Sequence, residues 1–235
     1  MSGRSLHWQS LPGSFDVHHT FALYPSTHAY GIPPLAPYHG PPPAWLWPYG
    51  TRVQSATPLP PGAMHFWRDD HRFERVWNRP WDTLPTIQRA GWVLTPDFSL
   101  YRDWPLAIQI YNCYRNRWCG AFWQEQGVTV IPAVSWALPP SYAFAFAGIT
   151  PGSVVAVTAR GLRSHDTRAW FTRGYQALVA QLQPSLVLVH GTLPPDLVDL
   201  APIHTYPSTW RGVWSVQRQA AESADTPEPE EQDGD

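Results

Sequence analysis

Apolar runs that end in polar residues alternate with segments of helical periodicity along most of the chain. Trp92–Leu94 is a short apolar strand that stops at Thr95-Pro96. A helix follows from about 103 to 126 and ends at Gly127, with Asp103 as its expected N-cap and Pro105 in its first turn. Another apolar strand covers 128–131. Two strands joined by a helix form a βαβ unit, so we expect them to be parallel with a right-handed crossover.

The same alternation continues on both sides of this unit. Further strands are expected at 64–67, 153–158 and 186–189, with a weaker one near Tyr206. Helices are expected at 71–77, 81–90, 168–182 (capped by Asp166 or Thr167) and 195–200, and the alternating run 142–149 is interpreted as a strand or buried edge. This order predicts an α/β fold with a mainly parallel sheet, either open or a small partial barrel, and flanking helices.

Proline and charge divide the chain into three parts. Residues 1–62 hold 12 of the 27 prolines together with several aromatic side chains, and we expect a Pro-rich arm that lays some of these aromatics on the body. Such an arm could also bind a protein partner. Residues 63–219 form the predicted α/β domain. Residues 220–235 are acidic and contain proline, which predicts a disordered tail.

Composition narrows the class of protein. The formal net charge is −2, but the last 15 residues hold seven acids and no base, so the body is basic. Without basic clusters this is weak support for nucleic-acid binding. Two cysteines six positions apart on one helix cannot form a disulfide there, which fits a reducing compartment. No apolar run is long enough for a membrane span, so the sequence predicts a cytoplasmic protein.

Polar side chains follow each predicted strand, where parallel α/β folds place their active sites. Asp70 follows the first strand, Asp97 and Ser99 the second, Trp136 the third, Arg160 the fourth and His190 the fifth. The predicted catalytic residues are Asp70, Asp97 and His190: Asp97 as a base or metal ligand with Asp70 as its partner, and His190 as an auxiliary acid or base that titrates near neutral pH. Ser99 and Arg160 are predicted to contact the ligand, and Trp136 to form a stacking wall.

Each of these assignments has a structural alternative. The aspartates could cap helices, Ser99 could bond the backbone, and His190 could be a satisfied core histidine. On the long helix, Asn112 and Arg115 share a polar stripe. Arg115 is predicted to clamp an anion, although Arg115 or Arg117 could instead pair with Asp97. No cofactor is indicated by a motif. Carboxylate ligation of a divalent metal is compatible with the pattern, whereas a structural zinc site is not.

Several motifs resemble those of one protein family. The runs FWRDDHRFERVWNRP, TPDFSLYRDWP, QIYNCYRNRWCGAFWQEQG, VIPAVSW and AGITPGSVVAVTARGL are similar to a family described as domain of unknown function forty-four seventeen, which phages, plasmids and bacteria carry. The resemblance extends from about Met64 to Gly191 and leaves out the arm and the tail. It implies a mobile-element context but assigns no reaction. The matched positions are Asp70, Asp97, Ser99, Asn112, Arg115, Gln124, Trp136 and Gly161.

Three hypotheses about function result. The leading one is an enzyme, a hydrolase or transferase, that acts on a small anionic or nucleotide-like ligand at the carboxyl edge of the sheet. The second is a non-catalytic accessory protein of a mobile element that binds a protein or a nucleic acid through the aromatic arm. In the third, the polar residues only brace a Trp-rich core.

Overall fold

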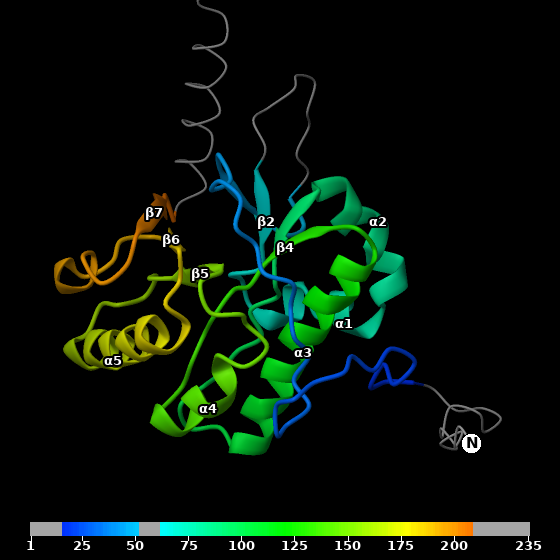
Figure 1. Ribbon diagram of the computed structural model, residues 1–235, viewed down its shortest axis with the longest axis horizontal. Coiled ribbons are helices and arrows are strands. Elements are labelled where there is room, and N and C mark those ends of the chain that lie inside the picture. Colours follow the sequence, from blue (N-terminus) through cyan, green and yellow to red (C-terminus); the bar gives the residue numbers. More distant parts are fainter. Residues whose placement is uncertain (1–15, 52–61, 209–235) are drawn as a thin grey trace, which may run out of the picture.

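Short parallel strands form the centre of the molecule. A computed structural model describes residues 16–51 and 62–208, and this part of the chain contains seven strands (Figure 1). One sheet has the order β1-β2-β3-β4 and the other the order β5-β6-β7, with every pair parallel. The strands are β1 (Leu46–Pro48), β2 (Ala63–His65), β3 (Trp92–Leu94), β4 (Thr129–Ile131), β5 (Val154–Thr158), β6 (Leu186–His190) and β7 (Ile203–Tyr206).

The two sheets together form a partial barrel. A parallel bridge between Ala133 and Ala156 connects the end of β4 to β5. One buried cluster takes a residue from every strand: Leu46, Ala63, Leu94, Ile131, Ala156, Leu188 and Tyr206. The Tyr206 hydroxyl also donates to the carbonyl of Pro43, 2.6 Å away, just before β1. Alternate strand residues therefore meet at one interior, as expected when a parallel sheet curves toward closure.

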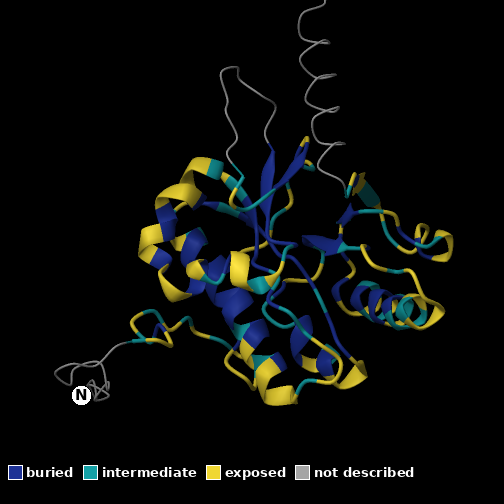
Figure 2. Ribbon diagram, turned by 180° about the vertical axis from the view of Figure 1, so that it is seen from behind, coloured by how far each residue is buried: buried dark blue, intermediate teal, exposed yellow. Residues whose placement is uncertain are grey.

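Helices cover the outer face of these strands. They are α1 (Arg75–Asn78), α2 (Pro80–Ala90), α3 (Leu106–Glu125), α4 (Tyr142–Ala145) and α5 (His165–Leu182), with short 3-10 turns at Asp70–Arg72, Pro139–Ser141 and Pro195–Leu197. Val93 and Val130 point outward to α2 and α3, and Val155 and Val187 point outward to α5. Figure 2 shows the strands as mostly buried, with exposed residues on the outer sides of the helices.

The predicted α/β class and the parallel pairing of β3 with β4 are confirmed, but three local predictions are wrong. The alternating run 142–149 contains helix α4, because Tyr142 and Phe146 stack four positions apart on the same side of a turn. Pro105, not Asp103, is the N-cap of α3. Ser164 caps α5 through a reciprocal capping box with Thr167, which starts the helix earlier than predicted.

The N-terminal arm takes part in the sheet. Leu46–Pro48 pairs with β2 as β1, a strand that hydrophobic periodicity does not reveal, because three residues with a terminal proline carry no periodic signal. The part of the arm upstream of β1 bonds to α3. There the Gln124 side chain accepts a hydrogen bond from the Ala36 amide and donates one to the Ala36 carbonyl, both at 2.9 Å. The Trp118 indole donates to the carbonyl of Ala22. Trp45 and Trp47 share a buried cluster with Trp123 of α3, so the expected packing of arm aromatics on the body is present. The predicted disordered tail lies outside the described residues.

Candidate functional site

A cleft with two lobes lies beyond the carboxyl ends of β2 to β5. The aromatic lobe has a cavity volume of about 240 Å³ and includes Tyr101, Trp136, Leu162, Trp170 and Phe171. The cationic lobe, of about 410 Å³, includes Trp67, Arg68, Asp69 and Arg72. Both lobes share Asp97, Ser99, Thr158 and Arg160, so they form one continuous cleft. A parallel sheet predicts a ligand site at this edge.

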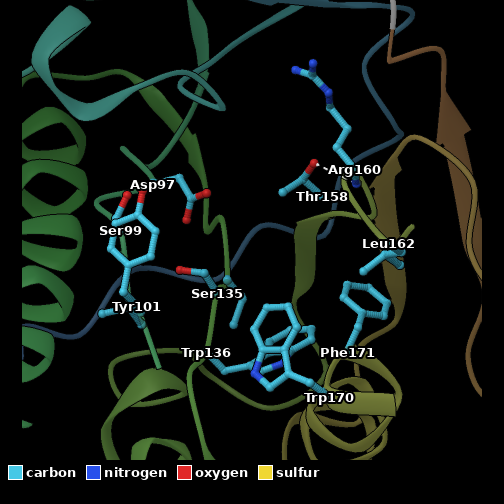
Figure 3. A pocket seen from close by; sticks show the side chains of 12 residues that line it. Asp97, Ser99, Tyr101, Ser135, Trp136, Thr158, Arg160, Leu162, Trp170 and Phe171 are labelled. Atoms are coloured by element: carbon cyan, nitrogen blue, oxygen red, sulfur yellow. Dashed lines mark hydrogen bonds between the residues drawn. The ribbon is translucent and has the colours of Figure 1, made fainter. Parts of the chain in front are cut away.

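Asp97 stands where the two lobes join. It follows β3 after Thr95-Pro96, and the Thr95 amide, which bonds to the carbonyl of Ile131, keeps this segment in line with β4. Figure 3 shows the carboxylate above Ser135, with Thr158 and Arg160 to its right and Trp136, Trp170 and Phe171 below. The chain thus holds one carboxylate between a cationic and an aromatic surface.

The Asp97 carboxylate lacks the partners that a buried acid normally has. Its Oδ1 atom is enclosed and accepts no hydrogen bond from the described residues. Burial raises the pKa of Asp97 to about 6, and the nearby charge of Asp70 adds to this rise, while the Ser135 hydroxyl and Arg117 oppose it. A carboxyl group with such a pKa can take up and release protons near neutral pH, as a general acid or base must.

Arg117 supplies a positive charge behind Asp97. The guanidinium is fully buried and donates to the carbonyls of Ala133, Ala145 and Ala147 and to the side chain of Asn116. Burial lowers the pKa of Arg117, and the charge of Asp97 counteracts this effect. No described acid forms an ion pair with Arg117. Asp97 and Arg117 therefore influence each other's pKa without forming an ion pair, and the pairing that the sequence offered as an alternative is not formed.

Asp70, Ser99, Asn112 and Arg115 form a chain of hydrogen bonds beside the cleft. The Asp70 carboxylate accepts from the Ser99 amide at 3.0 Å and from its hydroxyl at 2.8 Å. Asn112 donates to the Ser99 carbonyl at 2.7 Å and accepts from Arg115 at the same distance. Arg115 is ion-paired with Glu74 and lies over the Phe98 ring. This chain holds the loop that carries Asp97.

The predicted roles of Asp70 and Arg115 do not match these positions. Neither residue is among those that line the two lobes. Arg115 is paired with Glu74 instead of Asp97, because α1 brings Glu74 over this face of α3. Both side chains brace the loop that carries Asp97, Asp70 through its bonds to Ser99 and not as a helix cap, and only Ser99 of this group reaches the cleft.

His190 lies inside the barrel mouth and not among the residues that line the lobes. Its ring stacks on Trp67, with 4.7 Å between centroids, and packs against His65 at 4.8 Å. Burial and the neighbouring charge of Arg160 lower the pKa of His190 to about 4. Burial therefore favours the neutral form of the ring at pH 7, in place of the titration near neutral pH that the sequence suggested.

Trp136 and Arg160 reach the cleft from neighbouring strands. Trp136 forms part of the floor of the aromatic lobe, where its indole packs so closely on α5 that a Cβ at Gly174 would overlap its Nε1 atom. Arg160 is exposed, and no described acid forms an ion pair with it. Trp136 thus shapes the lobe from below, while Arg160 is available to a ligand.

Several lining residues were not predicted from the sequence. Arg68 and Thr158 stand at strand ends, so the rule that nominated Asp97 applies to their positions as well. Trp170 and Phe171 lie in the helix predicted at 168–182, which no sequence pattern linked to a ligand, and nothing in the sequence marks Tyr101. Among residues 16–51 and 62–208, no group of three or more His, Cys, Asp or Glu side chains is arranged to hold a metal ion, and no helix could cross a membrane.

Comparison with known proteins identifies the family. The profile of the family described as "Domain of unknown function (DUF4417)" matches residues 24–207, and the chain belongs to this family. The match begins well before Met64, so the resemblance seen in the sequence covered too little of the arm. The chain is 43% identical over 211 residues to the Gene 1 protein of Mycobacterium phage D29, covering 88% of this chain and 77% of the relative. It is 41% identical to the Gene 1 protein of Mycobacterium phage L5, covering 88% and 91%.

These relatives make the family phage-associated, and their names assign no activity. No solved structure matches the chain.

Proposed function

We propose that the protein is an enzyme, a hydrolase or transferase, that acts on a small anionic ligand in the two-lobed cleft, with Asp97 as its general base. The observation that carries this proposal is the Asp97 carboxylate itself, which combines an enclosed oxygen without a hydrogen-bond partner among the described residues and a pKa raised to about 6. Such a group costs stability, and proteins keep costly groups chiefly at functional sites.

The residues around Asp97 are suited to binding a small anionic ligand next to a general base. Arg160 and Arg68 place positive charge in the lobe next to the carboxylate, which favours an anion. The Ser99 and Thr158 hydroxyls at the junction of the lobes can orient a substrate by hydrogen bonds. The ligand could bring a divalent metal, held by Asp97 and its own oxygens.

The test is depletion of a substrate from a defined mixture. The purified protein is incubated with a pool of phosphorylated and carboxylated metabolites, with and without Mg²⁺, and the compounds are quantified by mass spectrometry. We expect wild type to consume at least one anionic compound, with a rate that rises as the pH increases through about 6, because a base must be ionised. Asp97→Asn should slow this consumption by about 10²-fold or more.

Asp103→Asn is the matched control. Asp103 is an exposed aspartate on the same loop, outside both lobes, and its substitution should leave the rate unchanged. If no compound is consumed in an Asp97-dependent way, the protein is not an enzyme of this kind, and the accessory-protein hypothesis becomes the better one.

A further inference from the structure

The cleft has two surfaces of different chemistry on either side of one carboxylate. In the aromatic lobe, Tyr101 is 55% exposed and packs edge-on against Trp104, with 4.7 Å between ring centroids. Trp170, which also lines this lobe, donates from its indole nitrogen to the carbonyl of Ala137. Flat apolar rings of this kind favour a planar ring in the ligand. In the cationic lobe, Arg68, Arg72 and Arg160 favour an anionic group.

Part of the positive charge in the cationic lobe is not compensated by an acid of the described residues, so this lobe can bind one anionic group. The Nη1 atom of Arg68 donates to the carbonyl of Tyr49 at 2.6 Å, which fixes one side of the guanidinium while its remaining donors stay available. Arg72 is paired with Asp69 at 3.4 Å, so these two charges compensate each other. Arg160 has no acidic partner among the described residues. Arg160 and Arg68 are therefore the cations that a phosphate would meet.

The arrangement matches a molecule with a planar ring at one end and a phosphate at the other. We propose that the substrate of the site is a nucleoside 5′-monophosphate, with its base in the aromatic lobe and its phosphate beside Arg160 and Arg68. Asp97, with Ser99 and Thr158, then faces the sugar, because these residues belong to both lobes (Figure 3). This assignment of the substrate class rests on the proposed function of Asp97.

Binding measurements with parts of the ligand test the assignment. Isothermal titration calorimetry compares the adenosine, guanosine, cytidine, uridine and thymidine 5′-monophosphates with the corresponding nucleosides and with ribose 5-phosphate. At least one monophosphate should bind about tenfold or more tightly than its nucleoside and than ribose 5-phosphate, because only the whole nucleotide fills both lobes. Equal affinities for the nucleotide and ribose 5-phosphate, or no binding of any monophosphate, would overturn the proposal.

Two variants test which lobe binds the phosphate of the ligand and which lobe binds its base. Arg160→Gln should weaken binding of the monophosphate about tenfold and leave the nucleoside unchanged, since it removes one charge-assisted contact to phosphate. Tyr101→Ala should weaken binding of both the monophosphate and the nucleoside and leave ribose 5-phosphate unchanged. The matched controls are Arg79→Gln and Tyr30→Ala, at exposed positions outside both lobes. If the controls act like the cleft variants, binding is non-specific and the proposal fails.

The two proposals can fail separately. Asp97-dependent consumption of an anion that is not a nucleotide would keep the enzyme and overturn the substrate class. Nucleotide binding with the expected response to Arg160→Gln and Tyr101→Ala, but without any turnover, would keep the ligand class and overturn the enzyme. Retention of nucleotide binding by Asp97→Asn would show that a loss of turnover in that variant is a loss of chemistry and not of binding.

Discussion

At the scale of single residues, the candidate site is marked by a carboxylate oxygen of Asp97 that has no hydrogen-bond donor among the described residues. Asp97 follows a strand, as many structural aspartates do, and the sequence alone could not separate a helix cap from a base. In the fold Asp97 caps no helix, because Pro105 is the N-cap of α3, and its Oδ1 atom is enclosed without a donor among the described residues. Its pKa depends on burial and on Asp70, Ser135 and Arg117 from other elements. Sequence position could thus nominate Asp97, but its electrostatic environment required the folded chain.

Asp97→Asn should make the protein more stable at neutral pH. The pKa of Asp97 is raised to about 6 in the folded state, so the folded form binds more protons than the unfolded form between about pH 4 and 6. Stability is therefore lost as pH rises through this window, and the loss persists above it. Thermal unfolding should show Asp97→Asn to be about 1–3 kcal/mol more stable at pH 7.5, with the advantage disappearing near pH 4. Asp103→Asn should show no such dependence. A destabilised Asp97→Asn at pH 7.5 would instead indicate a structural partner of Arg117.

His190→Phe should change the acid sensitivity of the fold. The folded-state pKa of His190 is lowered to about 4, so the unfolded chain binds more protons between about pH 4 and 6.5. The contribution of His190 to stability is present above this window and is lost as pH falls through it. A phenyl ring keeps the stack on Trp67 but cannot be protonated. Unfolding free energies from pH 4 to 7 should therefore fall less steeply for His190→Phe, while His39→Phe, at an exposed position, should behave as wild type.

At the scale of elements, the sequence predicted long periodic segments well and short or irregular ones poorly. The strands β5 and β6 were found because each is a five-residue, mainly apolar run, and β3 and β4 were found because they flank the long helix α3. Strand β1 was missed, and α4 was interpreted as a strand, because three or four residues cannot distinguish the periods of helix and sheet. The polar stripe of α3 looked like a ligand clamp because the sequence does not show that α1 places Glu74 against it.

The α3 stripe should behave as a structural brace. Arg115 is 9% exposed at its side chain, and its removal would leave Glu74 and Asn112 without their partner. We expect Arg115→Leu to lower the free energy of unfolding by about 2–4 kcal/mol in urea denaturation. Arg72→Leu breaks the exposed pair with Asp69 and should cost less than about 1 kcal/mol. Unchanged stability of Arg115→Leu together with lost nucleotide binding would restore the predicted role as an anion clamp.

At the scale of the whole molecule, the arm belongs to the fold that presents the cleft. Its strand β1 pairs with β2, whose end carries Arg68 into the cationic lobe, and its upstream part binds α3 and the segment after α4. The family match from residue 24 includes this part of the arm. The proline-rich composition suggested a separate arm, but proline also stiffens chains that lie on a surface without sheet pairing. Composition alone could not separate these two cases.

Gly148→Ala tests how much the docked arm contributes to stability. Gly148 has φ +75°, its carbonyl accepts from the Leu35 amide at 2.8 Å, and an added Cβ would overlap the Pro33 carbonyl oxygen. Gly152 has φ +81°, but no described atom lies within 4 Å of where its Cβ would stand, so Gly152→Ala introduces backbone strain alone. Gly152→Ala should cost about 1 kcal/mol, and Gly148→Ala about 2 kcal/mol more, because the arm must also move away. Limited proteolysis should then cut the arm faster in Gly148→Ala than in Gly152→Ala. Equal costs for both variants and equal cleavage would mean that the body holds its shape independently of the arm, and β1 would be the only part of the arm that the cleft requires.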